Sequence, residues 1–243
     1  MRILTLDIET SPMDCYAWSA WQQNILPNQI KTPTEMLTWA AHWLGEPKGK
    51  VIYRMIDDPD FLTKLHELLD EADMTVGYNH GKFDHRHINR EFVIHGLPPT
   101  RPVPMVDMLK VVKKQFLFPH NRLDYVASQV LGERKLETGG FDLWPEFLHG
   151  SPKAKRTMRK YNIQDTMLTE RLYKKLRPWV PNHPNVGDFD VRLSDRATDY
   201  SCEVCASNRI SLERPRRTRC FAIRVVKCNT CGHYQDGARK KLA

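Results

Sequence analysis

Four cysteines near the C-terminus place the strictest constraint on how this chain can fold. They form two Cys-x-x-Cys pairs, Cys202 with Cys205 and Cys228 with Cys231, which are separated by 22 residues. Pairs at this spacing are typical of a tetrahedral thiolate site for structural Zn²⁺. About 35 residues cannot build an adequate core alone, so bound zinc would supply the folding free energy. A redox-active pair of dithiols is the alternative interpretation.

The residues between the two pairs predict a small β structure around the metal. Residues 221–226 have the pattern of a strand that leads into the second pair, and the whole segment resembles a zinc ribbon. Four cysteines complete the ligand set, so His233 is not needed as a substitute. We expect Cys220 and the isolated Cys15 not to bind the metal.

Positive charge is concentrated in this same C-terminal segment. The formal net charge of the chain is +8. Residues 200–243 hold ten Lys and Arg against three acids, so they account for +7 of it. A basic segment indicates a polyanionic partner, with nucleic acid as the first candidate. The alternative is a solvated face that only aids solubility.

The remainder of the chain has the length and pattern of one α/β domain. Its 243 residues allow a medium-sized domain with its own core and a small appendage. Strand patterns alternate with helical ones, which predicts a mixed α/β domain. The predicted strands are 2–9, 37–44, 50–55, 74–78 and 103–106, and the predicted helices before residue 150 are 59–71, 84–95 and 123–131.

A long helix is predicted from Ser151 to Leu176. Ser151 can cap it, a proline suits its first turn, and two further prolines lie beyond its end. Residues 181–199 lack clear periodicity and are interpreted as a linker. We therefore expect three parts: a domain over residues 1–180, the linker over 181–199, and a zinc module over 200–243.

No apolar run of the sequence approaches the roughly 20 residues needed to cross a bilayer. The N-terminus reaches an acidic residue at position 7 without a signal-peptide pattern. These observations predict no membrane partner and a cytoplasmic protein, which would lie in the host cytoplasm if a phage encodes it. They do not identify a protein partner.

Two acids on the first predicted strand are the first candidates for chemistry. Side chains alternate along a strand, so Asp7 and Glu9 share one face, with Cα atoms about 6.5–7 Å apart. Carboxylates held this close repel each other unless a proton or a cation intervenes. Mg²⁺ and Mn²⁺ favour oxygen ligands and would resolve the repulsion. The alternative is a strand end whose acids simply face water.

Three more residues combine with this pair. Asp84 stands where a predicted strand passes into a helix, a position that an ordinary N-terminal helix acid could also occupy. Tyr161 and Asp165 are four residues apart, which places them on the inward face of the long helix. A buried Asp in an apolar stripe needs a partner, either a metal ion or a neighbouring Lys or Arg.

Together these patterns resemble the three motifs of the DEDDy (DnaQ-like) family of 3′–5′ exonucleases. The family motifs are Asp-x-Glu, Asn-x₂₋₃-(Phe/Tyr)-Asp and Tyr-x₃-Asp, and here they run from Asp7, Asn79 and Tyr161 respectively. The resemblance covers about residues 1–178. In the sister subfamily a His lies five residues before the last Asp, where this chain has Lys160. The closest likeness is to stand-alone phage and bacterial enzymes related to polymerase proofreading domains.

This resemblance implies a ribonuclease-H-like mixed sheet flanked by helices and a two-metal hydrolysis of phosphodiester bonds. Two Mg²⁺ or Mn²⁺ ions would be held by the four acids, and Tyr161 would aim the attacking water. The implied catalytic residues are Asp7, Glu9, Asp84, Tyr161 and Asp165. The expected substrate contacts are Asn79, Phe83, Arg159 and Lys160, although the two basic residues would suit a solvated helix face equally well.

The resemblance favours DNA with single-stranded 3′ ends as the substrate. An exoribonuclease that trims RNA would use the same acids. A non-catalytic nucleic-acid-binding adaptor on the same fold is a further alternative, but it would be expected to lack one member of the acid set.

Overall fold

The computed structural model describes residues 2–21, 24–184, 200–217 and 221–241. Most of the predicted linker over 181–199 lies outside these residues, and so does Cys220. Within the described part of the chain, no helix is long and apolar enough to cross a membrane.

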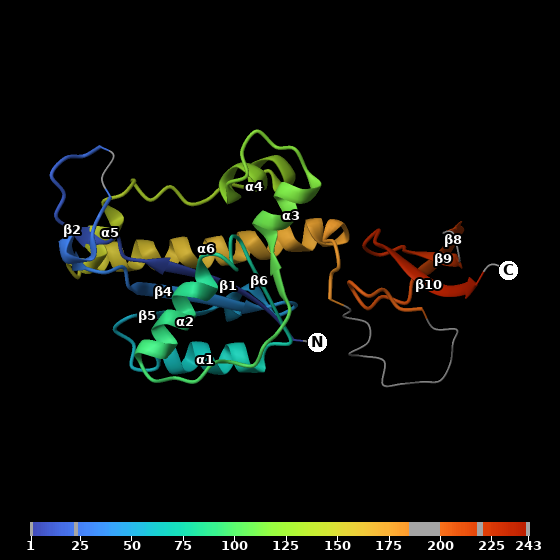
Figure 1. Cartoon of the computed structure of the whole chain (residues 1–243), viewed down its shortest axis with the longest axis horizontal. Helices are drawn as coiled ribbons and strands as arrows, with labels where there is room; N and C mark the ends of the chain where they lie inside the picture. Colours follow the sequence, from blue (N-terminus) through green and yellow to red (C-terminus); the bar gives the residue numbers. More distant parts are fainter. Residues whose placement is uncertain (1, 22–23, 185–199, 218–220, 242–243) are drawn as a thin grey trace.

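A mixed five-stranded sheet forms the centre of the larger part of the molecule (Figure 1). The strand order is β5-β4-β1-β6-β7, with β1 antiparallel to β4 and parallel to β6. This arrangement confirms the predicted α/β fold class. The strands are β1 (Ile3–Thr10), β4 (Met36–Trp43), β5 (Ile52–Met55), β6 (Met74–Gly77) and β7 (Met105–Asp107).

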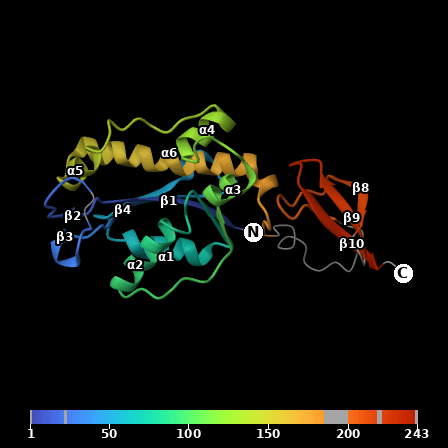
Figure 2. The ribbon, with the colours of Figure 1, turned by 45° about the horizontal axis from the view of Figure 1, so that its top comes forward.

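Side-chain alternation along β1 divides the core into two layers. Leu4, Leu6 and Ile8 point to the face covered by α1 (Phe61–Glu71) and α2 (Asp84–Ile94). The long helix α6 (Pro152–Leu176) crosses the other face, as the turned view shows (Figure 2). The acids at positions 7 and 9 of β1 therefore lie on the α6 side of the sheet.

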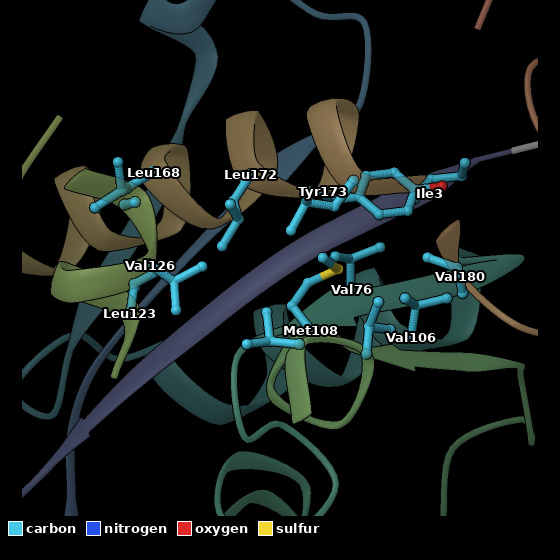
Figure 3. Close-up of a cluster of buried hydrophobic side chains, with 14 of the residues drawn as sticks. Ile3, Val76, Val106, Met108, Leu123, Val126, Leu168, Leu172, Tyr173 and Val180 are labelled. Atoms are coloured by element: carbon cyan, nitrogen blue, oxygen red, sulfur yellow. The ribbon is translucent and has the colours of Figure 1, made fainter. Parts of the chain in front are cut away.

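The C-terminal half of α6 is anchored in a continuous hydrophobic cluster (Figure 3). Its buried Leu168, Leu172 and Tyr173 pack with α3 (Met108–Gln115) and α4 (Leu123–Leu131). The N-terminal half of α6 packs instead against the short helix α5 (Leu143–Leu148). Because both halves of α6 are buried against other elements, its polar residues are held in fixed positions over β1.

The helix α6 begins and ends where the sequence predicts. The Ser151 side chain accepts a hydrogen bond from the Ala154 N–H, which satisfies one free donor of the first turn, and Pro152 occupies the first position. After Leu176 the chain forms a single 3-10 turn, η3 (Arg177–Trp179). The next residue, Val180, is buried in the same cluster as the C-terminal half of α6.

Sequence periodicity did not reveal α3, α5 or the two-stranded sheet of β2 (Asp14–Cys15) and β3 (Ile30–Thr32). The helix α3 has eight residues and α5 only six, so neither repeats an apolar spacing often enough to be recognised. Asp107 both ends β7 and caps α3, accepting a hydrogen bond from the Leu109 N–H. The predicted strand at 103–106 is displaced to 105–107 for this reason.

The C-terminal part is a three-stranded antiparallel sheet with β9 in the middle. Its strands are β8 (Ile210–Arg217), β9 (Phe221–Cys228) and β10 (Tyr234–Lys241), so the predicted strand at 221–226 is part of β9. The sheet contacts the larger part, because the Pro178 carbonyl accepts a hydrogen bond from His233 Nδ1 at 3.2 Å. Ala206 also packs against the cluster that anchors α6.

Candidate active site

Three acids meet where α6 crosses β1. Carboxylate oxygens of Asp7, Glu9 and Asp165 all lie within 4.8 Å of one another. Small residues of β4 permit this close approach, because Ala40 pairs with Asp7 in the sheet and its carbonyl accepts a hydrogen bond from Thr166 of α6 at 3.2 Å. The sheet register and the helix contact thus bring together acids that are 158 positions apart in the sequence.

Asp84 lies beside this group but is not one of the three that meet within 4.8 Å. Its Oδ1 accepts a hydrogen bond from the Ile8 N–H at 3.1 Å, and the side chain is buried. This N–H is free because β6 pairs with β1 only as far as Thr5 opposite Val76. The Asp84 carboxylate therefore accepts the hydrogen bond that a backbone carbonyl of β6 would accept if the strand pairing continued.

Burial and mutual repulsion raise the pKa values of the three converging acids, Asp7, Glu9 and Asp165. Burial, followed by the charges of Asp165 and Glu9, raises the pKa of Asp7 well above its ordinary range. Burial is the main cause that raises the pKa of Glu9, to about 8, and it also raises the pKa of Asp165. A cluster of this kind needs either protons or a bound cation to remain together near neutral pH.

One cation that the sequence did not reveal lies within this group. Lys135 Nζ is 2.5 Å from Asp165 Oδ2, and it donates a hydrogen bond to the Tyr161 hydroxyl at 2.7 Å. Burial is the largest single effect and lowers the pKa of Lys135, but Asp165 and Tyr161 together outweigh it and raise the pKa above its ordinary value. Lys135 lies in the segment between α4 and α5, where no periodic pattern marks it.

Two further residues hold the acids in place. Asn162 is fully buried; its Nδ2 donates to Asp7 Oδ2 at 2.7 Å, and its Oδ1 accepts from the Thr38 hydroxyl at 3.1 Å. Trp144 donates a hydrogen bond that lowers the pKa of Glu9, against the larger effect of burial. For Asn162, the only signal in the sequence was its position next to Tyr161. No sequence signal marked Trp144.

Tyr161 is suited to orient a molecule rather than to remove a proton. Burial, then the charge of Asp165, raises the pKa of Tyr161 above its ordinary value near 10. Its ring packs edge-on against Trp144 with centroids 6.2 Å apart. The hydroxyl therefore keeps its proton at neutral pH and is held by contacts on two sides.

A cleft that Asp7 lines, which we call the catalytic cleft, extends toward α3 and α4. It has a volume of about 770 Å³. Asn79 lies in its wall with a left-handed φ of 63°, which Asn tolerates better than most residues, and its N–H donates to Asp107 Oδ1 at 3.0 Å. The residues that line the cleft include Asp7, Asn79, Leu109, Lys113, Arg122 and Lys135.

The other predicted substrate contacts lie in different places. Phe83 is 37% exposed just before α2, where its ring meets that of His87. Arg159 and Lys160 are exposed on α6 and line a separate cavity of about 560 Å³. The structure thus places Asn79 in the catalytic cleft with Asp7, whereas the two basic residues line a different cavity.

The RNase H superfamily matches residues 4–177, which include all the acids of the site. The chain belongs to the RNase H superfamily. A search of curated proteins found no match. Among solved structures, the chain is similar to the family B DNA polymerase from the hyperthermophilic archaeon Pyrobaculum calidifontis, with a TM-score of 0.52 and 20% sequence identity.

That similarity covers 73% of this chain and 24% of the polymerase chain. At this identity it bears on the fold alone, and the chain spans a minor part of the length of the protein that it matches. The superfamily match and the structural likeness agree with the sheet order and confirm the ribonuclease-H-like fold. A fold of this superfamily indicates a nuclease, with nucleic acid as its substrate.

The acids of this RNase H fold suit a hard divalent cation. Carboxylate oxygens are the ligands that Mg²⁺ and Mn²⁺ favour. Asp165 Oδ1 is buried without a hydrogen-bond partner among the described residues, although such atoms are normally satisfied. The site thus combines an unused acceptor with an excess of negative charge. These two features are what a metal ion would satisfy.

The four cysteines converge as the sequence predicts. Their Sγ atoms lie within 4.8 Å of one another, with Cys202 to Cys231 and Cys205 to Cys228 both at 3.6 Å. Tetrahedral Zn²⁺ with bonds of about 2.3 Å requires sulfur atoms about 3.8 Å apart. Burial raises the pKa of Cys228, but hydrogen bonds from backbone N–H groups and with neighbouring cysteines together outweigh burial and lower it to about 6. The arrangement is consistent with a zinc ribbon.

Proposed function

We propose that the chain is a metal-dependent 3′–5′ exonuclease that acts on DNA, with single-stranded 3′ ends as its preferred substrate. The observation that carries this proposal is the convergence of Asp7, Glu9 and Asp165 within 4.8 Å, where Asp7 lines a cleft and Lys135 joins the group to Tyr161. Its catalytic domain would be residues 1–180, joined by the segment 181–199 to a zinc module over 200–243.

Each residue of the site has a task in this proposal. Two Mg²⁺ or Mn²⁺ ions, held by the four acids, would stabilise the entering and leaving oxygens when bound. The Tyr161 hydroxyl would hold the attacking water, since its pKa is raised and it remains a donor. Asn162 would keep Asp7 aimed at the reacting phosphate. The Lys135 ammonium would balance Asp165 and fix the phenol.

The remaining contacts would position the substrate. Asn79 would meet the terminal nucleotide in the catalytic cleft, and Phe83 would stack against a nearby base. Arg159 and Lys160 would contact phosphates of the strand where it passes over α6. The zinc module, through one structural Zn²⁺ and its positive charge, would help to hold nucleic acid.

The sequence motifs that resemble those of polymerase-proofreading-type exonucleases favour DNA, and RNA is the second candidate substrate. The test is to digest 5′-labelled single-stranded DNA, duplex DNA and RNA side by side with Mg²⁺ and Mn²⁺. We expect a ladder of labelled products that shortens from the 3′ end, fastest for single-stranded DNA. Release of the labelled 5′ nucleotide first would contradict the proposed direction.

Asp7→Asn provides the decisive variant. It should remove essentially all hydrolysis, while binding of DNA without added divalent metal should survive. Asp14→Asn changes an exposed acid of the same N-terminal region and serves as the matched control. If Asp7→Asn turned over DNA at a near-normal rate, the assignment of the active site would be wrong.

A further inference from the structure

A second cleft lies where the end of α6 meets the zinc module. It has a volume of about 690 Å³. One wall is formed by η3 and the residues after it, the other by β10, and Gln115 at the end of α3 closes one side. Figure 1 shows the C-terminal end of α6 beside the sheet of β9 and β10. The cleft is therefore built from two parts of the chain that the sequence separates.

Two aromatic rings face this cleft from opposite walls. Trp179 is 51% exposed and Tyr234 is 53% exposed, although large aromatic side chains are usually buried. Phe116 supports the Trp179 ring at 6.0 Å between centroids, and Lys227 Nζ lies 5.4 Å from the centre of the Tyr234 ring. Exposed rings with a cation beside them are the usual means of stacking unpaired bases.

The two walls are held together by specific contacts. His233 Nδ1 donates to the Pro178 carbonyl, and its Nε2 is 2.9 Å from Glu203 Oε1. Gln235 Oε1 accepts from the Glu203 N–H at 2.8 Å. Val180, the residue after Trp179, is buried in the hydrophobic core. The hydrogen bond between His233 and Pro178 thus joins the residues that are adjacent to Tyr234 and Trp179.

The second cleft continues the path of the catalytic cleft along α3. Leu109 and Lys113 line the catalytic cleft, and Gln115 of the same helix lines the second one. Asp165 and Leu176 are 11 residues apart on α6, or about 17 Å along the helix axis at 1.5 Å per residue. At a spacing of about 3.4 Å per nucleotide, roughly six nucleotides or fewer would bridge the two sites.

Positive charges accompany this path. Lys113 and Lys114 lie in the last turn of α3, and Lys175 lies in the last turn of α6 next to Lys174, which pairs with Glu170. Of the two acids that line the cleft, Glu203 is paired with His233, and the other is Asp236. A phosphate backbone could therefore follow cations from the catalytic acids to the aromatic rings.

We propose that this cleft binds the single-stranded nucleic acid upstream of the 3′ end, with bases stacked on Trp179 and Tyr234. The inference rests on the proposed exonuclease function, because the path begins at the catalytic acids. It gives the zinc module a specific task, since the metal-bound fold would place Tyr234 opposite Trp179. The cleft engages substrates only when they are long enough to reach it.

The test compares a 3-nucleotide with a 12-nucleotide single-stranded DNA in the full-length, zinc-loaded protein. Trp179→Ala and Tyr234→Ala should each raise KM for the long substrate by about 5- to 150-fold, the range for loss of one stacked base, and leave kcat unchanged. Neither should change the kinetics of the short substrate. Trp179→Phe and Tyr234→Phe keep a ring and should retain most of the affinity.

The control is Trp18→Ala, because Trp18 is 95% exposed and lies between β2 and β3 in the sequence. Figure 1 shows β2 at the end of the larger part that is far from the zinc-module sheet. One zinc per chain in every variant shows that the module is still folded. Equal changes for both substrate lengths, or no change for either, would overturn the inference. Lost affinity in the phenylalanine variants equal to that in the alanine variants would also overturn it.

Direct binding separates this inference from the proposed function. The affinity for a 5′-fluorescein 12-nucleotide strand is measured by anisotropy without added divalent metal. If the native chain hydrolyses no nucleic acid, the exonuclease proposal fails, but the cleft is supported when Trp179→Ala weakens binding of this strand. If hydrolysis is normal and Trp179→Ala binds as the native chain does, only the cleft proposal fails.

Discussion

The affinity of the acidic site for a divalent metal should depend steeply on pH. The perturbation is a change from pH 6 to pH 8 in protein whose zinc is retained. Burial raises the pKa of Glu9 to about 8, and the pKa of Asp7 is also raised. A metal binds the ionised carboxylates, so each proton that they hold must leave before or during binding.

The pKa of Glu9 sets the size of this effect. At pH 6 about one Glu9 carboxyl in a hundred is ionised, and at pH 8 about half are. Release of this one proton should therefore raise the apparent affinity for Mn²⁺ about 50-fold between pH 6 and pH 8. Release of a second proton from Asp7 would make the increase larger.

The same shift has a consequence for the metal-free protein. A carboxyl whose pKa is higher in the folded than in the unfolded state binds a proton more tightly when folded. Between pH 4.5 and about 8 the folded protein therefore holds more protons at Glu9, and its stability should fall as pH rises through this window. Added Mn²⁺ should reverse the loss, because it binds only the folded state.

Titration calorimetry with Mn²⁺ measures both the affinity and the number of protons released. Repeating it in buffers of different ionisation enthalpy counts the protons, and metal analysis checks that zinc stays bound. Glu9→Gln removes the group that titrates, so its affinity should be lower and less dependent on pH, whereas Asp14→Asn should match the native chain. An affinity that changes less than about threefold from pH 6 to pH 8 would refute this reasoning.

Three further predictions concern individual side chains. Tyr161→Phe should lower kcat on the order of 10²-fold, the range for one positioned catalytic group. Asp165→Asn should lower kcat further, because it removes a proposed metal ligand. An Asp165→Asn variant with unchanged kcat would contradict these roles. Lys135→Met keeps an unbranched side chain that is one atom shorter and removes the ammonium that holds the phenol. It should lower kcat by about tenfold or more in steady-state assays, and unchanged turnover would show that the ion pair is only structural. Cys228→Ser should release zinc and flatten the salt dependence of DNA affinity, and removal of residues 200–243 should do the same. Both variants should retain kcat at saturating substrate. An unchanged salt slope would mean that the module does not touch nucleic acid.

Local patterns of the sequence were sufficient to predict the elements that carry the acids. The opening strand has strict alternation, and the long helix has a cap, an apolar stripe and terminal prolines, so both were found close to their observed bounds. The Cys-x-x-Cys pairs predicted their own convergence in the same way. In each case the information lies within a few residues, where spacing alone determines which side chains share a face.

Elements and residues that depend on contacts between distant segments could not be predicted. Helix α3 is too short to show a period. It begins after Asp107, whose carboxylate accepts hydrogen bonds both from the first turn of the helix and from the Asn79 N–H. Lys135 lies in a segment without regular structure. It reaches the site only because that segment passes over α6 next to Tyr161.

The sequence by itself determined the chemistry that this protein has available: an acid pair on one strand face, an acid and a tyrosine on one helix face, and four cysteines with zinc-ligand spacing. Tertiary structure alone decided that Lys135 neutralises Asp165 and that Asn162 holds Asp7. It also decided that Trp179 faces Tyr234 across a cleft. Strand and helix periods describe direction within one element, whereas the distance between elements depends on how their side chains pack across the whole core.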